Sequence, residues 1–405
     1  MVYSHDAYGL GNISRMLAIC RFISKSMPNI SILLVSGSPL LHSFRLPQGL
    51  DYIKLPCLNR GQSGQIAVKY LNADIESTLK LRSELILAAA KNYQPDLLLV
   101  DKKPAGIMGE LQSTIRYLKT NLPETKFVLL LRDILDTPKK TIEEWQQEGY
   151  YRQVESLYDR ILVVGMQDIF DLVSEYQFSK TIADKVRYCG YIRKELGLKN
   201  RHIIRQELGL SKDTKLVLVT PGGGEDGYFL INNYLQGLAR QSDRFTRQNI
   251  HTLIFCGAQM PSLQQQQIER QAKRLPSVTI KEFTNDMMSY VHTADLVVSM
   301  CGYNTITEVL QTGKKAIVVP RIKPGREQLV RAQSLTKAGL IKMIHPEKLE
   351  PNLLIETVFN NLTSNKSSSK IVDLNFSGLS RVTDHLAMLL FNSFKLEPTP
   401  ASLLT

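Results

Sequence analysis

The sequence predicts an α/β protein built from two doubly wound domains. Short apolar segments rich in β-branched residues alternate with segments of helical pattern along most of the 405 residues. Continuous apolar strands that alternate with helices are typical of parallel sheets covered on both faces. The alternation restarts after residue 190, where the charged stretch 193–213 precedes a new apolar strand. A chain of this length also suits two domains better than one.

The individual elements follow from these patterns in chain order. Strands are predicted at Ser31–Ser36, Leu97–Val100, Phe127–Leu131, Ile161–Val164, Lys215–Thr220, His251–Cys256, Thr279–Phe283, Leu296–Ser299 and Ala316–Val319. Helices are predicted at Ser14–Ser24, Val68–Lys91, Tyr228–Arg240, Gln264–Leu275, Met287–His292, Thr305–Gln311 and Arg326–Ala338. We therefore predict an amino-terminal domain over 1–192, a carboxyl-terminal domain over 193–373, and a last helix within 374–396 that crosses back to the first domain.

Cysteine usage and hydropathy limit the class of protein. The five cysteines are odd in number, widely scattered and never in a CxxC pair. That usage argues against a disulfide framework or a zinc site and favours a reducing, cytoplasmic compartment. We expect no signal peptide and no membrane span, because the apolar runs are shorter than the roughly 18 residues that cross a bilayer. Only Met1-Val2-Tyr3 precede the first loop, which leaves open whether the native start lies upstream of Met1.

The chain is basic, with 50 lysines and arginines against 38 aspartates and glutamates, for a formal net charge of +12. A basic excess favours anionic partners such as nucleic acid, an acidic membrane face or a phosphorylated ligand. The excess is spread along the chain, without a long basic block or a nucleic-acid-binding motif. Nucleic acid is therefore not expected as a partner.

The first of three glycine-rich stretches is SHDAYGLGNISR, residues 4–15, at a predicted strand end. In open α/β sheets, ligands bind at the carboxyl ends of the strands. Gly9 and Gly11 lack a Cβ, so the backbone there can turn tightly and come close to an acceptor or a phosphate. Asn12 or Ser14 can cap the following helix. The alternative interpretation is a plain strand-to-helix turn.

The second stretch is TPGGGEDGY, residues 220–228. Gly222, Gly223 and Gly224 lie between a buried strand and a helix, where backbone N–H groups and the helix dipole favour a phosphate. The alternative is a flexible loop. The stretch lacks the ending of a P-loop, and neither glycine-rich stretch has the third glycine of the dinucleotide fingerprint.

The third stretch, 301–308, crowds Gly302, Tyr303 and Asn304 between a strand and a helix. Thr305 is predicted as the helix N-cap, with Glu308 at the capping-box position. That capping role explains the Thr/Glu pair but not the three residues before it. A ligand held against the helix start would explain them, and a carboxylate there can bind a pair of vicinal hydroxyls.

Polar residues also follow the next strand, in VVPRIKPGREQLVRAQSL, residues 318–335. Glu327 and Gln328 can bind sugar hydroxyls, and Arg321, Arg326 and Arg331 can hold a phosphate or a carboxylate. The alternative is an ordinary polar helix start.

Three segments together resemble a known family: FTNDM (283–287), ADLVVSMCGYNTITE (294–308) and VPRIKPGREQLVRA (319–332). They resemble the carboxyl-terminal donor domain of GT-B glycosyltransferases, similar to the family 28 enzymes that add N-acetylglucosamine to the lipid-linked peptidoglycan precursor. The resemblance is specific over about 215–345. In the amino-terminal half, only the loops around His5-Asp6, Asp101-Lys102-Lys103-Pro104 and Leu131-Arg132-Asp133 look like a branch of this superfamily.

The resemblance implies two Rossmann-like domains that face each other across a cleft, in a bacterial, cytoplasmic and inverting enzyme. By the same resemblance, each donor-site position has an implied role. Phe283 and Thr284 would contact the uracil ring, Gly222–Gly224 and Gly302–Thr305 would face the diphosphate, Glu308 would bind the ribose hydroxyls, and Glu327 and Gln328 would bind the donor sugar. Met287 and Arg321 are further predicted donor-binding residues. No cofactor or metal is expected, because no DxD motif stands at a predicted strand end.

The catalytic base is open at this point. Many relatives have His after the first GxG, whereas this chain has Asn12, and a neutral amide cannot act as a base near neutral pH. The candidates are His5, Asp6 and Asp101, and a His–Asp pairing would raise the basicity of the imidazole. The alternative is that His5 and Asp6 only hold the loop.

We therefore predict metal-independent transfer of a sugar from a nucleotide-diphosphate sugar, most simply a UDP-sugar, to a hydroxyl of a small-molecule or lipid-linked acceptor. The alternatives are a nucleotide-sugar epimerase and a non-catalytic UDP-sugar-binding subunit on the same fold. An apolar patch around 66–87, together with the basic charge, would bring the chain to the inner face of an anionic membrane. The alternative there is an ordinary amphipathic core helix.

Overall fold

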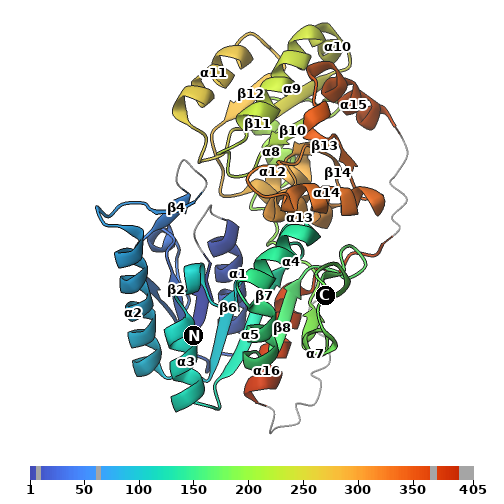
Figure 1. The fold of residues 1–405 in the computed structure, drawn as a ribbon. Coiled ribbons are helices and arrows are strands. Elements are labelled where there is room, and N and C mark those ends of the chain that lie inside the picture. The colour runs from blue at the N-terminus through green and yellow to red at the C-terminus, as the bar shows by residue number, and fades with distance from the viewer. Residues whose placement is uncertain (6–10, 61–64, 365–371, 392–405) are drawn as a thin grey trace.

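The computed structural model describes residues 1–5, 11–60, 65–364 and 372–391. Within these ranges the chain forms two lobes, each a parallel sheet with helices packed against it (Figure 1). The predicted α/β class with two doubly wound sheets is confirmed. None of the helices in the described ranges combines the length and the hydropathy that crossing a bilayer requires.

The sheet of the amino-terminal lobe has seven parallel strands in the order β3-β2-β1-β6-β7-β8-β9. Its strands are β1 (Val2–Ser4), β2 (Ile32–Ser36), β3 (Leu50–Lys54), β6 (Leu97–Asp101), β7 (Lys126–Arg132), β8 (Arg160–Val164) and β9 (Val186–Tyr188). Although β1 has only three residues, it lies in the middle of the sheet, where Val2 pairs with Leu34 on one side and Leu99 on the other. A separate antiparallel hairpin joins β4 (Leu58–Arg60) to β5 (Ile66–Val68).

The sheet of the carboxyl-terminal lobe has six parallel strands in the order β12-β11-β10-β13-β14-β15. Its strands are β10 (Lys215–Thr220), β11 (Ile250–Phe255), β12 (Val278–Lys281), β13 (Leu296–Ser299), β14 (Lys315–Val318) and β15 (Lys342–Met343). In both sheets the chain runs outward from a central strand and then returns to its other side. The reversals lie between β1 and β6 and between β10 and β13, which are the points where such sheets bind ligands.

Helices connect the strands and cover the sheets. The first lobe contains α1 (Gly11–Ser26), α2 (Ile75–Tyr93), α3 (Gln112–Asn121), α4 (Pro138–Gln147), α5 (Tyr150–Leu157), α6 (Leu172–Glu175) and α7 (Lys180–Ala183). The rest of the chain adds α8 (Arg201–Glu207), α9 (Tyr228–Arg240), α10 (Ser242–Arg247), α11 (Ser262–Ala272), α12 (Met287–Thr293), α13 (Tyr303–Thr312), α14 (Glu327–Lys337), α15 (Pro351–Thr363) and α16 (Gly378–Leu390).

The chain passes between the lobes twice, and the two passages lie side by side. The backbone N–H of Tyr191 donates to the Asn375 carbonyl oxygen over 2.8 Å, and the Gly378 N–H donates to the Tyr191 carbonyl over 3.0 Å. A Cβ on Gly190 or Gly378 would collide with the opposite backbone, so both glycines are required by this close approach. After the second passage, α16 packs against α1 of the first lobe.

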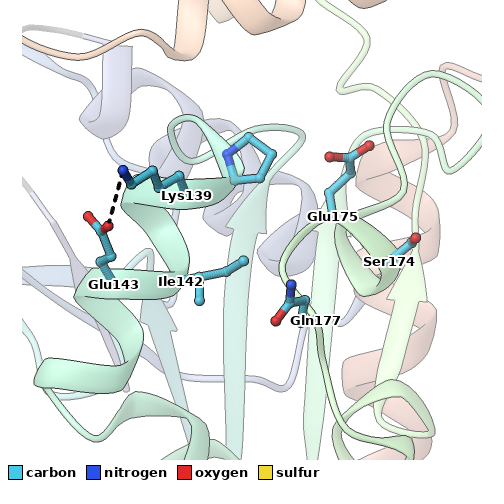
Figure 2. A pocket seen from close by; sticks show the side chains of 7 residues that line it. Lys139, Ile142, Glu143, Ser174, Glu175 and Gln177 are labelled. Carbon is cyan, nitrogen blue, oxygen red and sulfur yellow. Dashed lines mark ion pairs between the residues drawn. The ribbon is translucent and has the colours of Figure 1, made fainter.

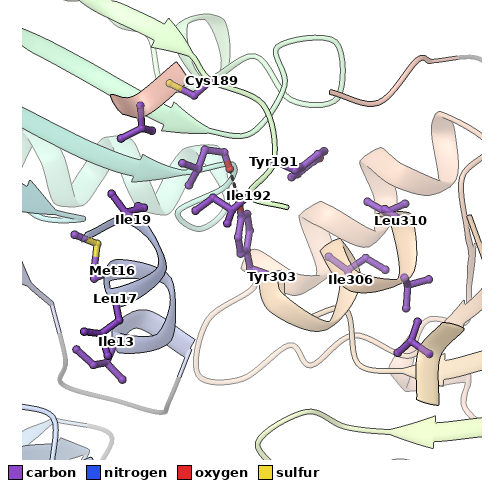
Figure 3. Packing of buried hydrophobic residues seen from close by; sticks show 14 of the residues in the cluster. Ile13, Met16, Leu17, Ile19, Cys189, Tyr191, Ile192, Tyr303, Ile306 and Leu310 are labelled. Carbon is purple, nitrogen blue, oxygen red and sulfur yellow. Dashed lines mark hydrogen bonds between the residues drawn. The ribbon is translucent and has the colours of Figure 1, made fainter. Parts of the chain in front are cut away.

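One apolar cluster extends through both lobes. Figure 3 shows side chains of α1 on one side and of α13 on the other, with Tyr191 and Ile192 of the first passage between them. The Tyr303 hydroxyl donates to the Val164 carbonyl oxygen over 2.9 Å. The lobes are therefore held together by buried packing as well as by the chain itself.

The structure corrects the predicted helix at Val68–Lys91. Val68 ends β5, where it pairs with Leu58, and α2 begins only at Ile75. The helix start is set by Asp74, whose carboxylate accepts from the Ser77 N–H over 2.7 Å. Val68 and its partner Leu58 are ten residues apart in sequence. The spacing of apolar residues within one helix gives no information about a contact of this kind.

Candidate functional site

The carboxyl ends of the two sheets face each other, so the candidate site lies between the lobes. Asp133 directly follows β7, and Arg331 lies in α14, 198 residues later. They form a bidentate ion pair, with Nε to Oδ2 at 2.6 Å and Nη2 to Oδ1 at 2.8 Å, and both side chains are 2% exposed or less. Arg331 also donates to the Cys301 carbonyl oxygen over 3.1 Å. The interpretation of Arg331 as a ligand-binding arginine is therefore wrong, because Asp133 already neutralises it.

The glycine loop after β10 supplies backbone to the carboxyl-terminal edge of the site. Gly222 and Gly224 have φ of +87° and +96°. A Cβ on Gly224 would collide with the Cys256 carbonyl oxygen, and one on Gly222 would lie 3.2 Å from the Thr305 hydroxyl. Gly223 lies between them and next to Gln259, so Gly222 is the glycine of this loop that lies beside the start of α13. Such an arrangement of glycine backbone beside a helix N-terminus suits a phosphate.

Helix α13 begins at Tyr303, two residues before Thr305, which was predicted as its N-cap. Its N-cap is Gly302 and its first residue is Tyr303, so Thr305 lies inside the first turn and Glu308 in the second. The prediction that Thr305 is the N-cap is wrong. Cys301 adopts a left-handed φ of +68° and turns the chain directly into the helix.

Two residues at the start of α13 contact the other lobe. Tyr303 is buried in the apolar cluster and bonds to Val164, so its side chain points into the interface between the lobes. Asn304 donates through Nδ2 to the Gly11 carbonyl oxygen over 3.3 Å. Their predicted contact with the donor stays a prediction, and the structure gives each of them a partner across the cleft.

Glu308 is a partly buried carboxylate one turn into α13. Burial raises its pKa to about 7, although the positive charge of Lys194 acts in the opposite direction. Among the described residues, no side chain or backbone group donates a hydrogen bond to this carboxylate. A hydroxyl pair that donated to it would satisfy its oxygens and favour its ionised form.

Arg321 and Glu327 form the end of the site that follows β14. Arg321 Nη2 lies 2.7 Å from Glu327 Oε1, and its Nη1 lies 3.4 Å from Asp226 Oδ2. Its backbone N–H donates to Gln328 Oε1 over 3.2 Å. Burial alone would raise the pKa of Glu327, but Arg321 and then Arg132 outweigh it and lower the pKa to about 2. Glu327 is therefore ionised at neutral pH and acts as an acceptor only.

The loop after β12 carries the residues implied for a uracil ring. Phe283 is 51% exposed, and an exposed ring of this kind can stack on a planar base. The Thr284 hydroxyl accepts from the Asp286 N–H over 3.0 Å, and Asp286 in turn caps α12 through Ser289. Met287 is the first residue of α12 and packs against the apolar cluster. The cap at Asp286 thus fixes the end of this loop, and the ring of Phe283 is exposed on it.

At the amino-terminal edge, the described residues show which groups Asp101 contacts. Asp101 binds Arg15 over 2.8 Å and accepts from the backbone N–H of His5 over 3.3 Å. His5 itself is only 3% exposed, and its Nδ1 has no hydrogen-bond partner in the described part of the chain. Burial first, and then Lys102 and Lys103, lower the pKa of His5. Asp101 therefore does not pair with the His5 ring among the described hydrogen bonds, since its carboxylate pairs with arginine and backbone instead. A pairing of His5 with Asp6 stays a prediction, because Asp6 lies outside the described residues.

The glycine stretch on this edge is described only in part. Gly11 is the first residue of α1, and the Asn12 amide donates to the His5 carbonyl oxygen over 2.7 Å. Asn12 therefore holds the turn after β1 in place. The candidates Asp6 and Gly9 lie outside the described residues.

Two cations that the sequence did not single out lie at the same edge. Lys102 follows β6 with a left-handed φ of +72°, and Arg132 ends β7 with its Nε buried and unpartnered among the described residues. Burial first, then Arg132 and Lys103, lower the pKa of Lys102 to about 7, while Asp101 and Glu327 act to raise it. The negative charge of Glu327 acts to raise the pKa of both Lys102 and Arg132, so the two cations lie on the edge that faces the carboxyl-terminal lobe.

Comparison with known proteins gives this geometry a family context. Residues 217–377 match the model of the glycosyltransferase family 28 C-terminal domain. The UDP-N-acetylglucosamine--N-acetylmuramyl-(pentapeptide) pyrophosphoryl-undecaprenol N-acetylglucosamine transferase of Acetivibrio thermocellus is 24% identical over 385 residues, with 93% of each chain covered. The chain is a glycosyltransferase of the GT-B fold, similar to family 28.

Solved structures agree with this glycosyltransferase in fold. The MurG structure from Acinetobacter baumannii has a TM-score of 0.60 at 14% identity, over 95% of this chain and 97% of the other. A putative UDP-N-acetylglucosamine 2-epimerase from Listeria monocytogenes has a TM-score of 0.64 at 12% identity, over 99% of each chain. At these identities the likeness shows the shared two-lobed fold and does not separate the two activities.

A surface pocket elsewhere in the glycosyltransferase does not coincide with this site. Figure 2 shows it between the start of α4 and the segment 174–177, lined by charged and polar side chains. Its one ion pair joins Lys139 to Glu143 over 4.0 Å, with both side chains largely exposed. None of the predicted site residues lines this pocket, so the candidate site stays the interlobe edge.

Lys102, Arg132 and Asp133 lie within the strand-end motifs of the sequence, but no role was predicted for them. Each directly follows or ends a strand of the first sheet, and that position was the available signal. Their partners lie far away in sequence, so the charge balance around them could not be read from the motifs.

Proposed function

We propose that this glycosyltransferase moves a sugar from a UDP-sugar, with N-acetylglucosamine as the first donor to test, to a hydroxyl of a lipid-linked or small-molecule acceptor. The proposal rests on one arrangement: Gly222 of the glycine loop lies beside Thr305 at the start of α13, with Glu308 one turn along the same helix. The choice of donor follows the Acetivibrio thermocellus relative, which is an N-acetylglucosamine transferase that uses UDP-N-acetylglucosamine. Metal independence and inversion at the anomeric carbon are parts of the same proposal.

The chemistry assigned to the carboxyl-terminal lobe is leaving-group stabilisation. Negative charge develops on the departing diphosphate in the transition state, and preorganised backbone N–H groups at a helix start stabilise it in a site from which water is excluded. Glu308 would bind the ribose hydroxyls, and Glu327 with Gln328 would bind hydroxyls of the donor sugar. Within the described ranges, no three His, Cys, Asp or Glu side chains gather as metal ligands do.

The acceptor side of the proposal is a peripheral contact with the membrane that carries a lipid-linked acceptor. Tyr70, Leu71, Leu81 and Leu85 are large apolar side chains left 64%, 48%, 43% and 38% exposed in the region from β5 through α2. Together with the net charge of +12, this surface fits an anionic bilayer. Vesicles containing anionic lipid should co-sediment the protein at low salt, and a Leu81→Glu/Leu85→Glu variant should stay in the supernatant.

The donor site is tested by ligand-dependent thermal stability. UDP at about a hundred times its dissociation constant should stabilise the fold by roughly 2.7 kcal/mol, whereas ADP and GDP at the same concentration should have little effect. Equal shifts with all three nucleotides, or no shift with any, would contradict a uridine site. Release of UDP in the presence of EDTA then tests the metal, and NMR of the product tests inversion.

An epimerase is the second candidate, because a solved structure titled as a UDP-N-acetylglucosamine 2-epimerase matches the fold as well as a glycosyltransferase does. The family model matches the transferase family instead. Incubation with UDP-N-acetylglucosamine alone separates the two. Conversion to a second UDP-sugar without an acceptor would favour the epimerase, and an unchanged donor that turns over only with acceptor would favour the transferase.

A further inference from the structure

The turn between β7 and α4 reaches from the amino-terminal lobe to helix α14 of the other lobe. It carries two acids, Asp133 and Asp136. Asp133 holds Arg331 in the buried ion pair described above. Asp136 accepts through Oδ1 from the backbone N–H of Arg326, 190 residues away in sequence, over 3.0 Å. The Asp136 side chain is 13% exposed, so this second contact is the more accessible of the two to water.

The contact of Asp136 is a helix cap supplied by the other lobe. Arg326 is the N-cap residue of α14, and its own side chain makes no capping hydrogen bond. An arginine side chain has no acceptor to offer, and the first N–H groups of a helix lack partners within the helix. The Asp136 carboxylate provides an acceptor at this end, and its negative charge is favourable beside a helix N-terminus.

Contacts within the amino-terminal lobe hold Asp136 in place. Its Oδ1 accepts from the Thr137 N–H over 2.8 Å, and its Oδ2 accepts from Lys140 Nζ over 2.7 Å. The Asp136 carbonyl oxygen accepts from the Tyr176 hydroxyl over 3.1 Å. The position of Asp136 therefore does not depend on α14, and whether the cap forms depends on how close the two lobes are.

The segment that leads into α14 fits closely against Asp136. A Cβ on Gly325 would lie 3.1 Å from Asp136 Oδ2 and 2.7 Å from Glu327 Oε2. Gly325 is not among the glycines with positive φ, so the small space beside the two carboxylates is the reason for a glycine here. Lys140 and Arg321 each pair with one of these carboxylates, which offsets the repulsion between them.

The capped end of α14 carries Glu327 and Gln328, the two residues predicted to bind the donor sugar. Both are buried. Gln328 Nε2 lies 3.8 Å from the position that a Cβ on Gly302 would take, and Gly302 is the N-cap of α13. The first turn of α14 therefore lies beside the helix start that the proposed function assigns to the diphosphate.

We propose that Asp136 is a positioning residue for the donor sugar: by capping α14 from the amino-terminal lobe, it fixes Glu327 and Gln328 in the geometry that binds the sugar. This inference rests on the proposed function. UDP alone binds to the carboxyl-terminal lobe, through the glycine loop, α13 and the loop at Phe283. The sugar requires, in addition, that the two lobes are in contact. Recognition of the correct sugar is thereby coupled to closure of the cleft.

The test compares the dissociation constants of UDP and of UDP-N-acetylglucosamine by isothermal titration. Asp136→Ala should bind UDP as the wild type does and UDP-N-acetylglucosamine about tenfold more weakly, as expected for one lost hydrogen bond to a charged group. Asp136→Asn keeps an acceptor oxygen and should recover most of the lost affinity. Glu143→Ala is the matched control, because Glu143 is an exposed acid of α4 that pairs with Lys139, and it should change neither constant.

Hydrogen–deuterium exchange tests the cap without any ligand. The Arg326 amide should exchange several-fold faster in Asp136→Ala than in the wild type or in Glu143→Ala. Unchanged exchange would mean that Asp136 does not cap α14, and an equal change in affinity for both ligands would mean that the cap does not position the sugar-binding residues. If the wild type bound neither ligand, the proposed function and the role in sugar binding would both fail, whereas faster exchange in Asp136→Ala would still establish the cap between the lobes.

Discussion

The two edges of the cleft differ in the chemical groups that they present. The carboxyl-terminal edge presents glycine backbone at 222–224 and a helix start at Gly302, with acids at Glu308 and Glu327. The amino-terminal edge presents cationic side chains, Lys102 and Arg132, over a buried histidine. Backbone groups suit a ligand part of fixed shape such as a diphosphate, whereas side chains can be exchanged without altering the fold. Under the proposed function, backbone groups would therefore recognise the diphosphate of the donor, and side chains would carry the chemistry of the acceptor.

The strongest test of how the edges depend on each other is Arg331→Met. This substitution leaves the buried Asp133 carboxylate without its partner, and loss of one member of a buried pair costs about 3–5 kcal/mol. Urea unfolding should show that loss. Lys139→Met, which removes the exposed partner of Glu143, should leave the unfolding midpoint unchanged. A loss below about 1 kcal/mol in Arg331→Met would mean that the lobes do not rely on this pair.

Gly224→Ala tests whether the carboxyl-terminal edge depends on backbone. The added Cβ would meet the Cys256 carbonyl at a φ of +96°, so we expect about 1–3 kcal/mol of destabilisation and weaker binding of UDP. Isothermal titration and thermal unfolding measure the two effects. Gly313→Ala is the matched control, because Gly313 also has a positive φ, +63°, but its Cβ would meet nothing within 4 Å. Equal UDP affinity in both variants would contradict the loop's role.

Glu308→Gln tests the single acid assigned to the ribose. Burial raises the pKa of Glu308 to about 7, and donation by two hydroxyls favours the carboxylate, so UDP should bind more tightly as pH rises from 6 to 8. Glu308→Gln should bind about tenfold more weakly at pH 8, which corresponds to a lost hydrogen bond to a charged group, and its affinity should not vary with pH. 2′-Deoxy-UDP should show a smaller difference between the two proteins. A pH-independent wild-type affinity would sink this assignment.

Thr305→Ala has the smallest expected effect. Thr305 lies inside the first turn of α13, so alanine should change the free energy of unfolding by less than about 0.5 kcal/mol. Loss of a true N-cap would cost about 1 kcal/mol. Chemical denaturation distinguishes the two values, and the larger one would restore the capping role that the structure removes.

Local patterns were enough for most of the strands and for several helices. The apolar runs at 97–100, 215–220 and 296–299 became β6, β10 and β13 with bounds shifted by no more than a residue. Errors arose where a distant contact prevailed, as at Val68, which pairs in a hairpin, and at Thr305, where the turn at Cys301 starts the helix early. The helices α3, α4, α5 and α15 were among those not predicted, although the first three are clearly amphipathic.

The sequence by itself determined the class of the fold, because hydrophobic periodicity acts through neighbours along the chain, whereas the donor-binding roles of the residues at the strand ends stay predictions. Only the tertiary structure decided how the charges are balanced. Asp101 pairs with Arg15 across 86 residues and Asp133 with Arg331 across 198, which leaves Lys102 as an amine without a counter-ion among the described residues. Electrostatic free energy depends on distance and burial in three dimensions, and neither quantity can be read from order along the chain.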